Sequence, residues 1–203
     1  MLIVYCQTRD NFWDSPSEDF LVTYSPLTCL SLAATKKPEA IFMDLPFGSL
    51  DLNSKQLELV DCLKRDTRIR QIPLFVLLSS PQKVLLEKLD SSKSLRVILC
   101  NTSAITPSDI CEFINNPGPS YFPGYLASII CPFINYEPFK EDEEIALCGA
   151  DKNRLVLNQK RLHKYCNNRE HLNCPFFLHP IPGDDDKLSV CCKNYQRQNN
   201  NAE

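Results

Sequence analysis

Five short apolar segments, separated by stretches with helical periodicity, most constrain what this chain of 203 residues can fold into. A short apolar run bounded by polar residues is typical of a strand that is buried on both faces of a parallel sheet. Strands that alternate with helices predict an α/β fold, a five-stranded parallel sheet flanked by helices. The expected strands are 2–6, 20–24, 40–43, 74–78 and 95–100.

Helices are expected at 26–35, 54–65, 81–89 and 107–115. Pro81 suits the first turn of a helix, and Thr106 is a plausible N-cap for the last one. One link departs from the pattern, because residues 7–19 are mostly polar and have little helical periodicity. The first helix of the alternation is therefore expected to be short, irregular or absent.

The middle of this region carries a recognisable pattern. An apolar strand ends in Asp44, with Pro46 and Gly48 close behind, and a later apolar strand ends in Ser79 and Ser80. In these features, residues 1–116 resemble the receiver domain of response regulators. The resemblance implies a receiver-like or flavodoxin-like sheet, with Asp44 at the position of the phosphoryl acceptor and Ser79 or Ser80 at that of the hydroxyl group.

Other positions of the receiver pattern do not carry over. The first strand ends in Cys6 and Gln7 where the family has a pair of Mg²⁺-binding acids, and the nearest acid is Asp10. The fifth strand is followed by Asn101, where the family has a lysine nearby. Phosphoryl transfer depends on the metal and the lysine to neutralise charge. We therefore expect a phosphorylation-deficient domain that serves protein interaction and signal transduction.

Eleven cysteines are present, and six of them follow residue 130. The N-terminus has no signal-peptide pattern and no apolar stretch is long enough to span a membrane, so a cytoplasmic protein is expected. An odd cysteine count in such a chain argues against a full disulfide framework. Four cysteines are flanked by proline, glycine or aromatic residues and are the candidate cofactor and metal ligands: Cys131, Cys148, Cys166 and Cys174.

Four thiolates can hold a 4Fe–4S cluster or complete a tetrahedral Zn²⁺ site. Zinc sites favour closely spaced cysteine pairs, and none occurs among these four, whereas a cluster accepts ligands from separate segments. The pattern also resembles a cysteine motif of small anaerobe proteins. A 4Fe–4S cluster is therefore preferred, with Zn²⁺ as the alternative, His171 as a possible zinc ligand, and packed thiols without metal as the third reading.

The remaining cysteines and histidines have simpler interpretations. The five cysteines before residue 130 are expected to pack as small apolar residues, and the vicinal Cys191 and Cys192 could be a substitute ligand or a redox pair. His163 could, like His171, be a zinc ligand, but the histidines, His179 included, are more simply residues at the surface or beside the ligands. The acidic runs 141–144 and 184–186 are expected to be solvated loops.

The predicted organisation is a receiver-like domain (1–116), a linker (117–130), a cysteine-rich module (131–192) and a disordered tail (193–203). With a net charge of −3, nucleic-acid or membrane binding is not indicated, and a protein partner is expected. The chain is expected to be a non-catalytic regulatory or adaptor protein with a redox-sensing or structural cluster. An electron-transfer accessory protein and a zinc-stapled interaction module are the alternatives.

Overall fold

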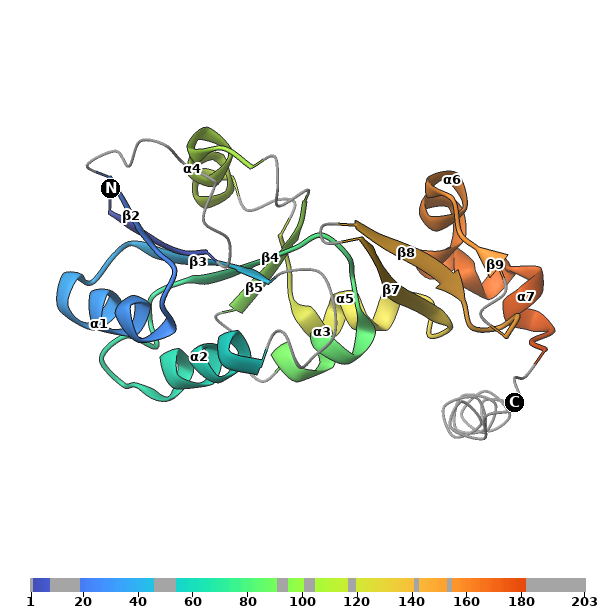
Figure 1. The fold of residues 1–203 in the computed structure, drawn as a ribbon, viewed down its shortest axis with the longest axis horizontal. Coiled ribbons are helices and arrows are strands. Elements are labelled where there is room, and N and C mark those ends of the chain that lie inside the picture. The colour runs from blue at the N-terminus through green and yellow to red at the C-terminus, as the bar shows by residue number, and fades with distance from the viewer. Residues whose placement is uncertain are drawn as a thin grey trace. The chain divides into compact units, whose positions relative to one another are not determined.

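The computed structural model describes residues 2–7, 19–45, 54–90, 95–100, 105–116, 120–140, 143–152 and 155–181. The chain divides into two compact units (Figure 1). Unit 1 comprises Met1–Ser128, and unit 2 comprises Ile129–Glu203.

Unit 1 is built on one sheet with the strand order β2-β1-β3-β4-β5-β6. The first five strands are mutually parallel, and their order is that of flavodoxin-like doubly wound folds. The predicted five-stranded parallel sheet flanked by helices is therefore confirmed. The strands are β1 (Ile3–Cys6), β2 (Phe20–Thr23), β3 (Ala40–Leu45), β4 (Leu74–Leu78), β5 (Leu95–Leu99) and the short antiparallel β6 (Ser120–Tyr121).

One face of this sheet carries large aromatic side chains. Phe42 of β3 and Phe75 of β4 are register partners whose rings stack with centroids 4.7 Å apart. Helix α4 (Pro107–Asn115) lies on this face (Figure 1) and contributes the fully buried Ile110 to the same core. A complete capping box begins α4, because Thr106 and Asp109 satisfy each other's backbone N–H groups.

The opposite face is covered by α1 (Pro26–Lys36), α2 (Ser54–Arg65) and α3 (Lys83–Leu89), which lie together on that side (Figure 1). Each helix buries an apolar stripe, with Ala33 from α1 and Leu86 from α3 completely inaccessible to solvent. Among the described residues, no helix combines the length and apolar character that crossing a bilayer requires.

Several predicted boundaries in unit 1 differ from the structure by one or two residues, and two of these differences matter here. Helix α3 begins two residues later than predicted, because Gln82 has extended backbone angles and serves as the N-cap. Strand β3 continues to Leu45, so Asp44 lies inside the strand with a buried side chain. Residues 7–19, where a helix was expected to be weak, lie mostly outside the described residues.

The predicted linker 117–130 is corrected by the structure. It contains strand β6, which pairs with β5, and helix α5 (Pro123–Ile129), which buries Leu126 and Ala127. Its prolines and glycines were interpreted as linker residues, but Pro123 begins a helix. The N–H of Gly124 donates to Asp90 Oδ1 at 2.8 Å. Glycine suits this position because a Cβ would collide with the same carboxylate.

Unit 2 begins with a three-stranded antiparallel sheet in the order β7-β8-β9. Short helical turns follow, including the π-helical turn η1 and the 3₁₀-helix η2. The predicted tail 193–203 and the pair Cys191–Cys192 lie outside the described residues. The elements are β7 (Ile134–Lys140), β8 (Glu143–Cys148), β9 (Leu155–Val156), α6 (Gln159–Arg161), η1 (Leu162–Cys166), η2 (Arg169–Asn173) and α7 (Pro175–Leu178).

Two leucine-to-alanine substitutions test the packing of unit 1. Leu86→Ala removes a side chain that is 0% exposed and should lower the free energy of unfolding by about 2–5 kcal/mol. Leu27→Ala changes a side chain that is 79% exposed and should change it by less than about 0.5 kcal/mol. Urea unfolding of both variants measures the difference, and equal effects would contradict the placement of α3.

Candidate metal centre

The four cysteines selected from the sequence line one cavity in unit 2. Cys131 precedes β7, Cys148 ends β8, Cys166 ends η1, and Cys174 precedes α7. Each residue is buried, with between 6% and 9% of its surface exposed. Four segments that are well separated in sequence therefore deliver one thiol each to the same interior space.

Backbone hydrogen bonds tie these segments together independently of the sulfur atoms. The N–H of Cys131 donates to the carbonyl of Cys166 at 2.8 Å, joining the first and third cysteine segments. The N–H of Gly149 donates to the carbonyl of Phe133 at 2.7 Å, joining the turns that follow Cys131 and Cys148. The backbone therefore fixes how the cysteine segments lie relative to one another.

Backbone N–H groups also act directly on two of the thiols. The N–H of Phe133 favours the thiolate of Cys131, and the N–H groups of Ala150 and Asp151 favour that of Cys148. Hydrogen bonds from backbone amides to cysteine sulfur are among the features that tune thiolate ligands. The turns predicted around these two cysteines thus aim donors at their sulfur atoms.

Burial acts against these donors and keeps the thiols protonated. It raises the pKa of Cys131 to about 12 and that of Cys166 to about 11, and neighbouring cysteines of the cavity raise both further. Burial likewise raises the pKa of Cys148. Several thiolates cannot share this apolar space unless a cation neutralises them, and a bound metal deprotonates its thiol ligands outright.

The cavity wall is otherwise largely apolar and aromatic. Phe133 and Phe177 meet edge to face with their ring centroids 5.7 Å apart. Leu157, Tyr165 and Phe176 complete much of the wall. Such a wall excludes water, and for a metal centre it would control dielectric and solvent access.

His171 also lines the cavity and is buried, with 3% of its surface exposed. Its Nδ1 lies 2.7 Å from the carbonyl oxygen of Asn168. If Nδ1 donates to that carbonyl, Nε2 keeps its lone pair, which is the usual arrangement of a metal-binding histidine. His163 and His179 are exposed, as predicted.

The site needs a further rearrangement before it can bind a metal. In the part of the chain that the structure describes, no three His, Cys, Asp or Glu side chains are arranged so that they could hold a metal ion. The cavity has a volume of about 10 Å³, which is room for about one water molecule. The donor set fits a tetrathiolate centre in number and chemistry, but the thiols must turn toward a common point.

Sequence reasoning missed two residues of this cavity, Arg161 and Tyr165. The guanidinium carbon of Arg161 lies 4.9 Å from the ring centroid of Phe176, and its charge favours the thiolate of Cys166. Both residues precede Cys166 within the pattern Arg161-Leu-x-x-Tyr165-Cys166, a helical spacing that could have indicated a shared face. The basic side chain is the positive charge that an anionic centre requires.

The cysteines of unit 1 have no such arrangement among the described residues. Cys6 and Cys29 are buried, and Cys100 and Cys111 pack partly buried against the core, as expected. Cys62 is exposed, so the expectation that it packs as a small apolar residue is wrong. It lies on the solvent side of α2, whose buried stripe is formed by Leu59, Val60 and Leu63.

Asp44 influences the ionisation of two neighbouring side chains, Tyr5 and Cys100. Its carboxylate raises the pKa of Tyr5, after the larger effect of burial, and contributes to raising that of Cys100 to about 12, after burial and Asp109. Gln7 follows β1, where the receiver pattern has acids, and its Oε1 is buried without a hydrogen bond among the described residues. Ser79 and Ser80 follow β4 as predicted.

Three positions invoked for the receiver pattern lie outside the described residues, namely Asp10, Asn101 and the loop from Pro46 to Gly48. Among the described residues, Asp44 does not belong to a group of three or more His, Cys, Asp or Glu side chains that could hold a metal ion. The loss of phosphoryl chemistry at Asp44 therefore stays a prediction from the sequence.

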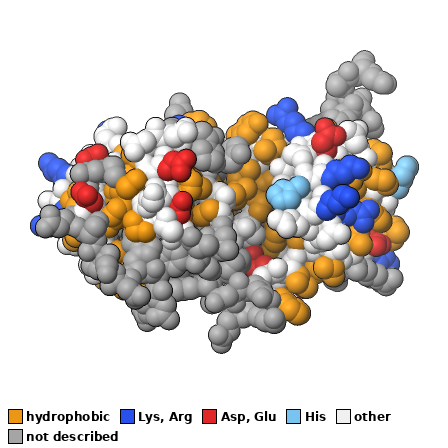
Figure 2. Space-filling view, turned by 90° about the horizontal axis from the view of Figure 1, so that it is seen from above, with side chains coloured by type: hydrophobic (Ala, Val, Ile, Leu, Met, Phe, Trp, Pro, Cys, Tyr) orange, Lys and Arg blue, Asp and Glu red, His pale blue; other side chains and the backbone are white. Residues whose placement is uncertain are grey.

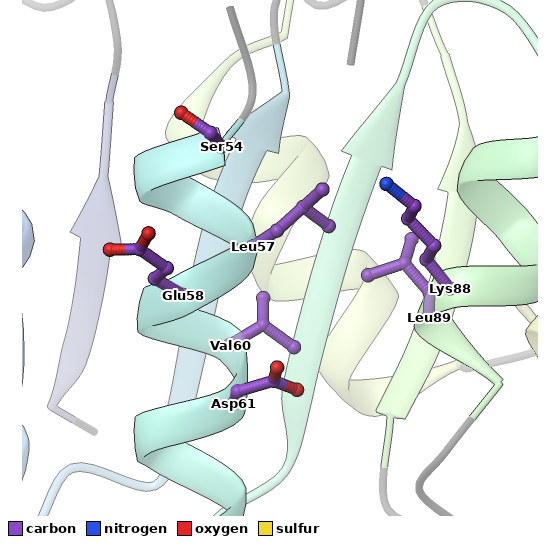
Figure 3. A pocket seen from close by; sticks show the side chains of 7 residues that line it. All are labelled: Ser54, Leu57, Glu58, Val60, Asp61, Lys88 and Leu89. Carbon is purple, nitrogen blue, oxygen red and sulfur yellow. The ribbon is translucent and has the colours of Figure 1, made fainter. Parts of the chain in front are cut away.

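A larger hollow on unit 1 lies between α2 and α3 (Figure 3). This groove has a volume of about 370 Å³, and Leu57, Val60 and Leu89 line it. Glu58 and Asp61 rise from α2 on one side, and Lys88 stands on α3 at the other. The groove gathers neither a nucleophile with a base nor a metal-ligating group from the described residues.

Comparison of the chain with protein-family models, with curated proteins and with solved structures gives no match in any of the three. The functional interpretation therefore depends on the geometry and chemistry of the described residues.

Replacing Cys174 with serine tests the ligand set. We expect Cys174→Ser to lose bound metal and to unfold unit 2, because one thiol is removed from a tetrathiolate site. Unit 1 should stay folded, since its core contains no cysteine of this cavity. Metal analysis and limited proteolysis measure both effects, with Cys62→Ser as the control. Unchanged metal content in Cys174→Ser would refute the assignment.

Thiol alkylation tests the environment of the cavity. Where circular dichroism shows that unit 2 stays folded after metal removal, iodoacetamide at pH 8 should modify the exposed Cys62 at least about tenfold faster than the buried Cys131, because a raised pKa leaves Cys131 little thiolate. An ordinary thiol stops gaining reactivity above about pH 9, whereas Cys131 should still gain about tenfold per unit up to pH 10. Peptide mapping by mass spectrometry measures both rates, and similar profiles would show that the cavity is open.

Proposed function

We propose that this protein is a non-catalytic regulatory or adaptor protein in which four cysteines of unit 2 hold a 4Fe–4S cluster. The cluster serves redox sensing or structural support, and unit 1 is a phosphorylation-deficient, receiver-like interaction domain. The convergence of Cys131, Cys148, Cys166 and Cys174 on one cavity is the observation that carries the proposal.

The composition of the core of unit 2 supports a bound metal. Besides Gly149, eleven buried residues are described between Ile129 and Ile181, of which four are the cavity cysteines and one is His171. The rest are Ile130, Ile134, Ala146, Leu147, Ala150 and Leu157. Folded units below about 70 residues gain little from an apolar core and commonly need disulfides or a metal. All four cysteines are free thiols, so a metal is the available cross-link.

Three features favour a cluster over a single ion. The four ligands come from four segments without a close cysteine pair, which suits a centre wider than one ion. The aromatic wall shields the site, and Arg161 supplies a positive charge beside it. Four thiolates around a dipositive 4Fe–4S core carry a net charge of about −2, which a cubane spreads over more atoms than a zinc ion does.

Zinc is the second candidate, and the size of the cavity favours it. Space for about one water-sized sphere suits one ion, whereas a cubane requires the four cysteine segments to move outward. His171 would then be a fifth donor, able to replace one thiolate in a Cys₃His site. A zinc centre would make unit 2 a stapled interaction module without redox chemistry.

The strand order of unit 1 and the residues that end β1 support an interaction role. A doubly wound domain retains its fold when its site loses reactive groups, because packing specifies the fold. Cys6 and Gln7 stand where metal-binding acids would be needed for phosphoryl transfer. An electron-transfer accessory protein remains the alternative function if the cluster is redox-active.

Protein purified without oxygen provides the test, through its visible spectrum and its iron and zinc content. We expect a brown protein with broad visible absorption and about four irons per chain. Cys131→Ser should abolish both signals, while Cys62→Ser should leave them unchanged. One zinc per chain in a colourless protein would replace the cluster by the zinc candidate. A metal-free protein with unit 2 folded would reject both centres.

A further inference from the structure

Two of the cavity cysteines are joined directly through their backbones. The N–H of Cys131 donates to the carbonyl oxygen of Cys166 at 2.8 Å. Because backbone bonds are about 1.2–1.5 Å long, a hydrogen bond of this kind keeps the two Cα atoms less than about 7 Å apart. A disulfide bridges Cα atoms that are about 4.4–6.8 Å apart. The main chain therefore holds this pair at a spacing that a disulfide can span.

The side chains of the same two residues face one small space. Cys131 and Cys166 both line the cavity of about 10 Å³, which has room for about one water molecule. Both are free thiols, and both are buried. A cavity of this size separates the groups that line it by little more than one water molecule, so the two sulfur atoms need only a small movement to meet.

Electrostatic effects among the thiols agree with close spacing. Burial is the largest cause of the raised pKa of Cys131, and among the other cavity cysteines Cys166 adds most, ahead of Cys148 and Cys174. Burial also leads for the raised pKa of Cys166, followed by Cys148 and Cys174. All four sulfur atoms thus influence one another, and the backbone hydrogen bond is what distinguishes Cys131 and Cys166 as a pair.

Positive charge lies beside one member of the pair. Arg161 lines the cavity, and its guanidinium group favours the thiolate of Cys166. Figure 2 shows further Lys and Arg side chains on the surface of unit 2. Peroxides oxidise the thiolate form of cysteine, so this charge favours oxidation of a thiol that burial otherwise protects.

We propose that hydrogen peroxide, an oxidant small enough to approach the cavity, converts Cys131 and Cys166 to a disulfide. One thiolate attacks the peroxide, the O–O bond breaks, and the sulfur becomes a sulfenic acid as one water leaves. The second thiol then displaces the hydroxyl group of the sulfenic acid, so that the S–S bond forms and a second water leaves. Two electrons pass from the sulfur atoms to the peroxide, and both thiol protons end in water.

The disulfide itself needs no metal, because two neighbouring sulfur atoms are enough. Its regulatory consequence rests on the proposed function, since a bond between Cys131 and Cys166 removes two of the four thiolate ligands of the proposed centre. Oxidation would then release the metal, and unit 2 would keep a covalent cross-link in its small core instead. The pair would make the site a switch between a metal-bound state and a disulfide-bonded state.

The pairing that the fold predicts differs from the pairing of an unfolded chain. Cys174 lies eight positions after Cys166, whereas Cys131 lies 35 positions before it. Closing a longer loop costs more entropy, so an unfolded chain favours a bond between Cys166 and Cys174. Preference for a bond between Cys131 and Cys166 therefore requires a folded unit 2.

Peroxide oxidation of the reduced full chain, freed of metal with a chelator, tests the proposal. The remaining thiols are alkylated, and linked peptides are identified by tandem mass spectrometry. The link between Cys131 and Cys166 should exceed that between Cys166 and Cys174 at least about fivefold, and concentrated urea should reverse this preference. Cys131→Ser and Cys166→Ser should each abolish the link, and dithiothreitol should reduce it. The matched control Cys62→Ser removes an exposed thiol of α2 and should leave the link unchanged.

Metal analysis of the same protein before chelation separates the possible failures. Cys131 and Cys166 that stay free thiols after peroxide treatment, or a dominant bond between Cys166 and Cys174, would overturn the disulfide. In a protein purified with metal, either result would leave the proposed function in place. A protein that is metal-free as purified and forms the expected bond would reject the proposed centre and retain the disulfide. In the metal-loaded chain, peroxide should release metal as the bond forms, and bond formation without release would overturn the switch.

Discussion

The organisation of unit 2 depends on sulfur where a larger domain would use apolar side chains. Its cysteines occupy the interior, and backbone hydrogen bonds such as that from Cys131 to Cys166 hold the cysteine segments together. Burial favours the neutral thiols of Cys131, Cys148 and Cys166, and the proposed metal would compensate their thiolates within the same low-dielectric core. The same buried thiols therefore form part of the core of unit 2 and its candidate binding site.

Unit 1 is stabilised by an ordinary apolar core. Its sheet is covered by α4 on one face and by α1, α2 and α3 on the other, so that every central strand is buried on both sides. This packing does not depend on which side chains stand at the carboxyl ends of the strands. Asp44 lies near Tyr5 and Cys100, where its carboxylate adds to the effect of burial in raising the pKa of both side chains.

The sequence was most informative where packing and periodicity agree. Helices α2 and α4 begin and end where apolar spacing and the Thr106 cap predict, because local signals and burial act in the same direction. The prediction of a linker at 117–130 was wrong, because proline can also begin a helix and glycine can also permit a close contact, as between Gly124 and Asp90. That contact joins residues distant in sequence, and no local pattern encodes it.

The four cavity cysteines could be selected from their flanking residues, but the chemistry around them could not. The aromatic wall and Arg161 become visible only when the chain is folded, since Phe133 and Phe177 are far apart in sequence. The exposure of Cys62 shows a second limit of prediction from the sequence. Helical periodicity identifies a buried stripe, yet a cysteine beside that stripe has no sequence mark that places it inside or outside.

The order of the cysteines along the chain has a consequence for biosynthesis. All of unit 1 leaves the ribosome before Cys131, and Cys174 is the last of the four cavity thiols to be translated. N-terminal domains generally fold first during synthesis. Unit 1 can thus be complete and ready for a partner while unit 2 still lacks its last thiol. The cell's metal supply would then govern the maturation of unit 2 alone.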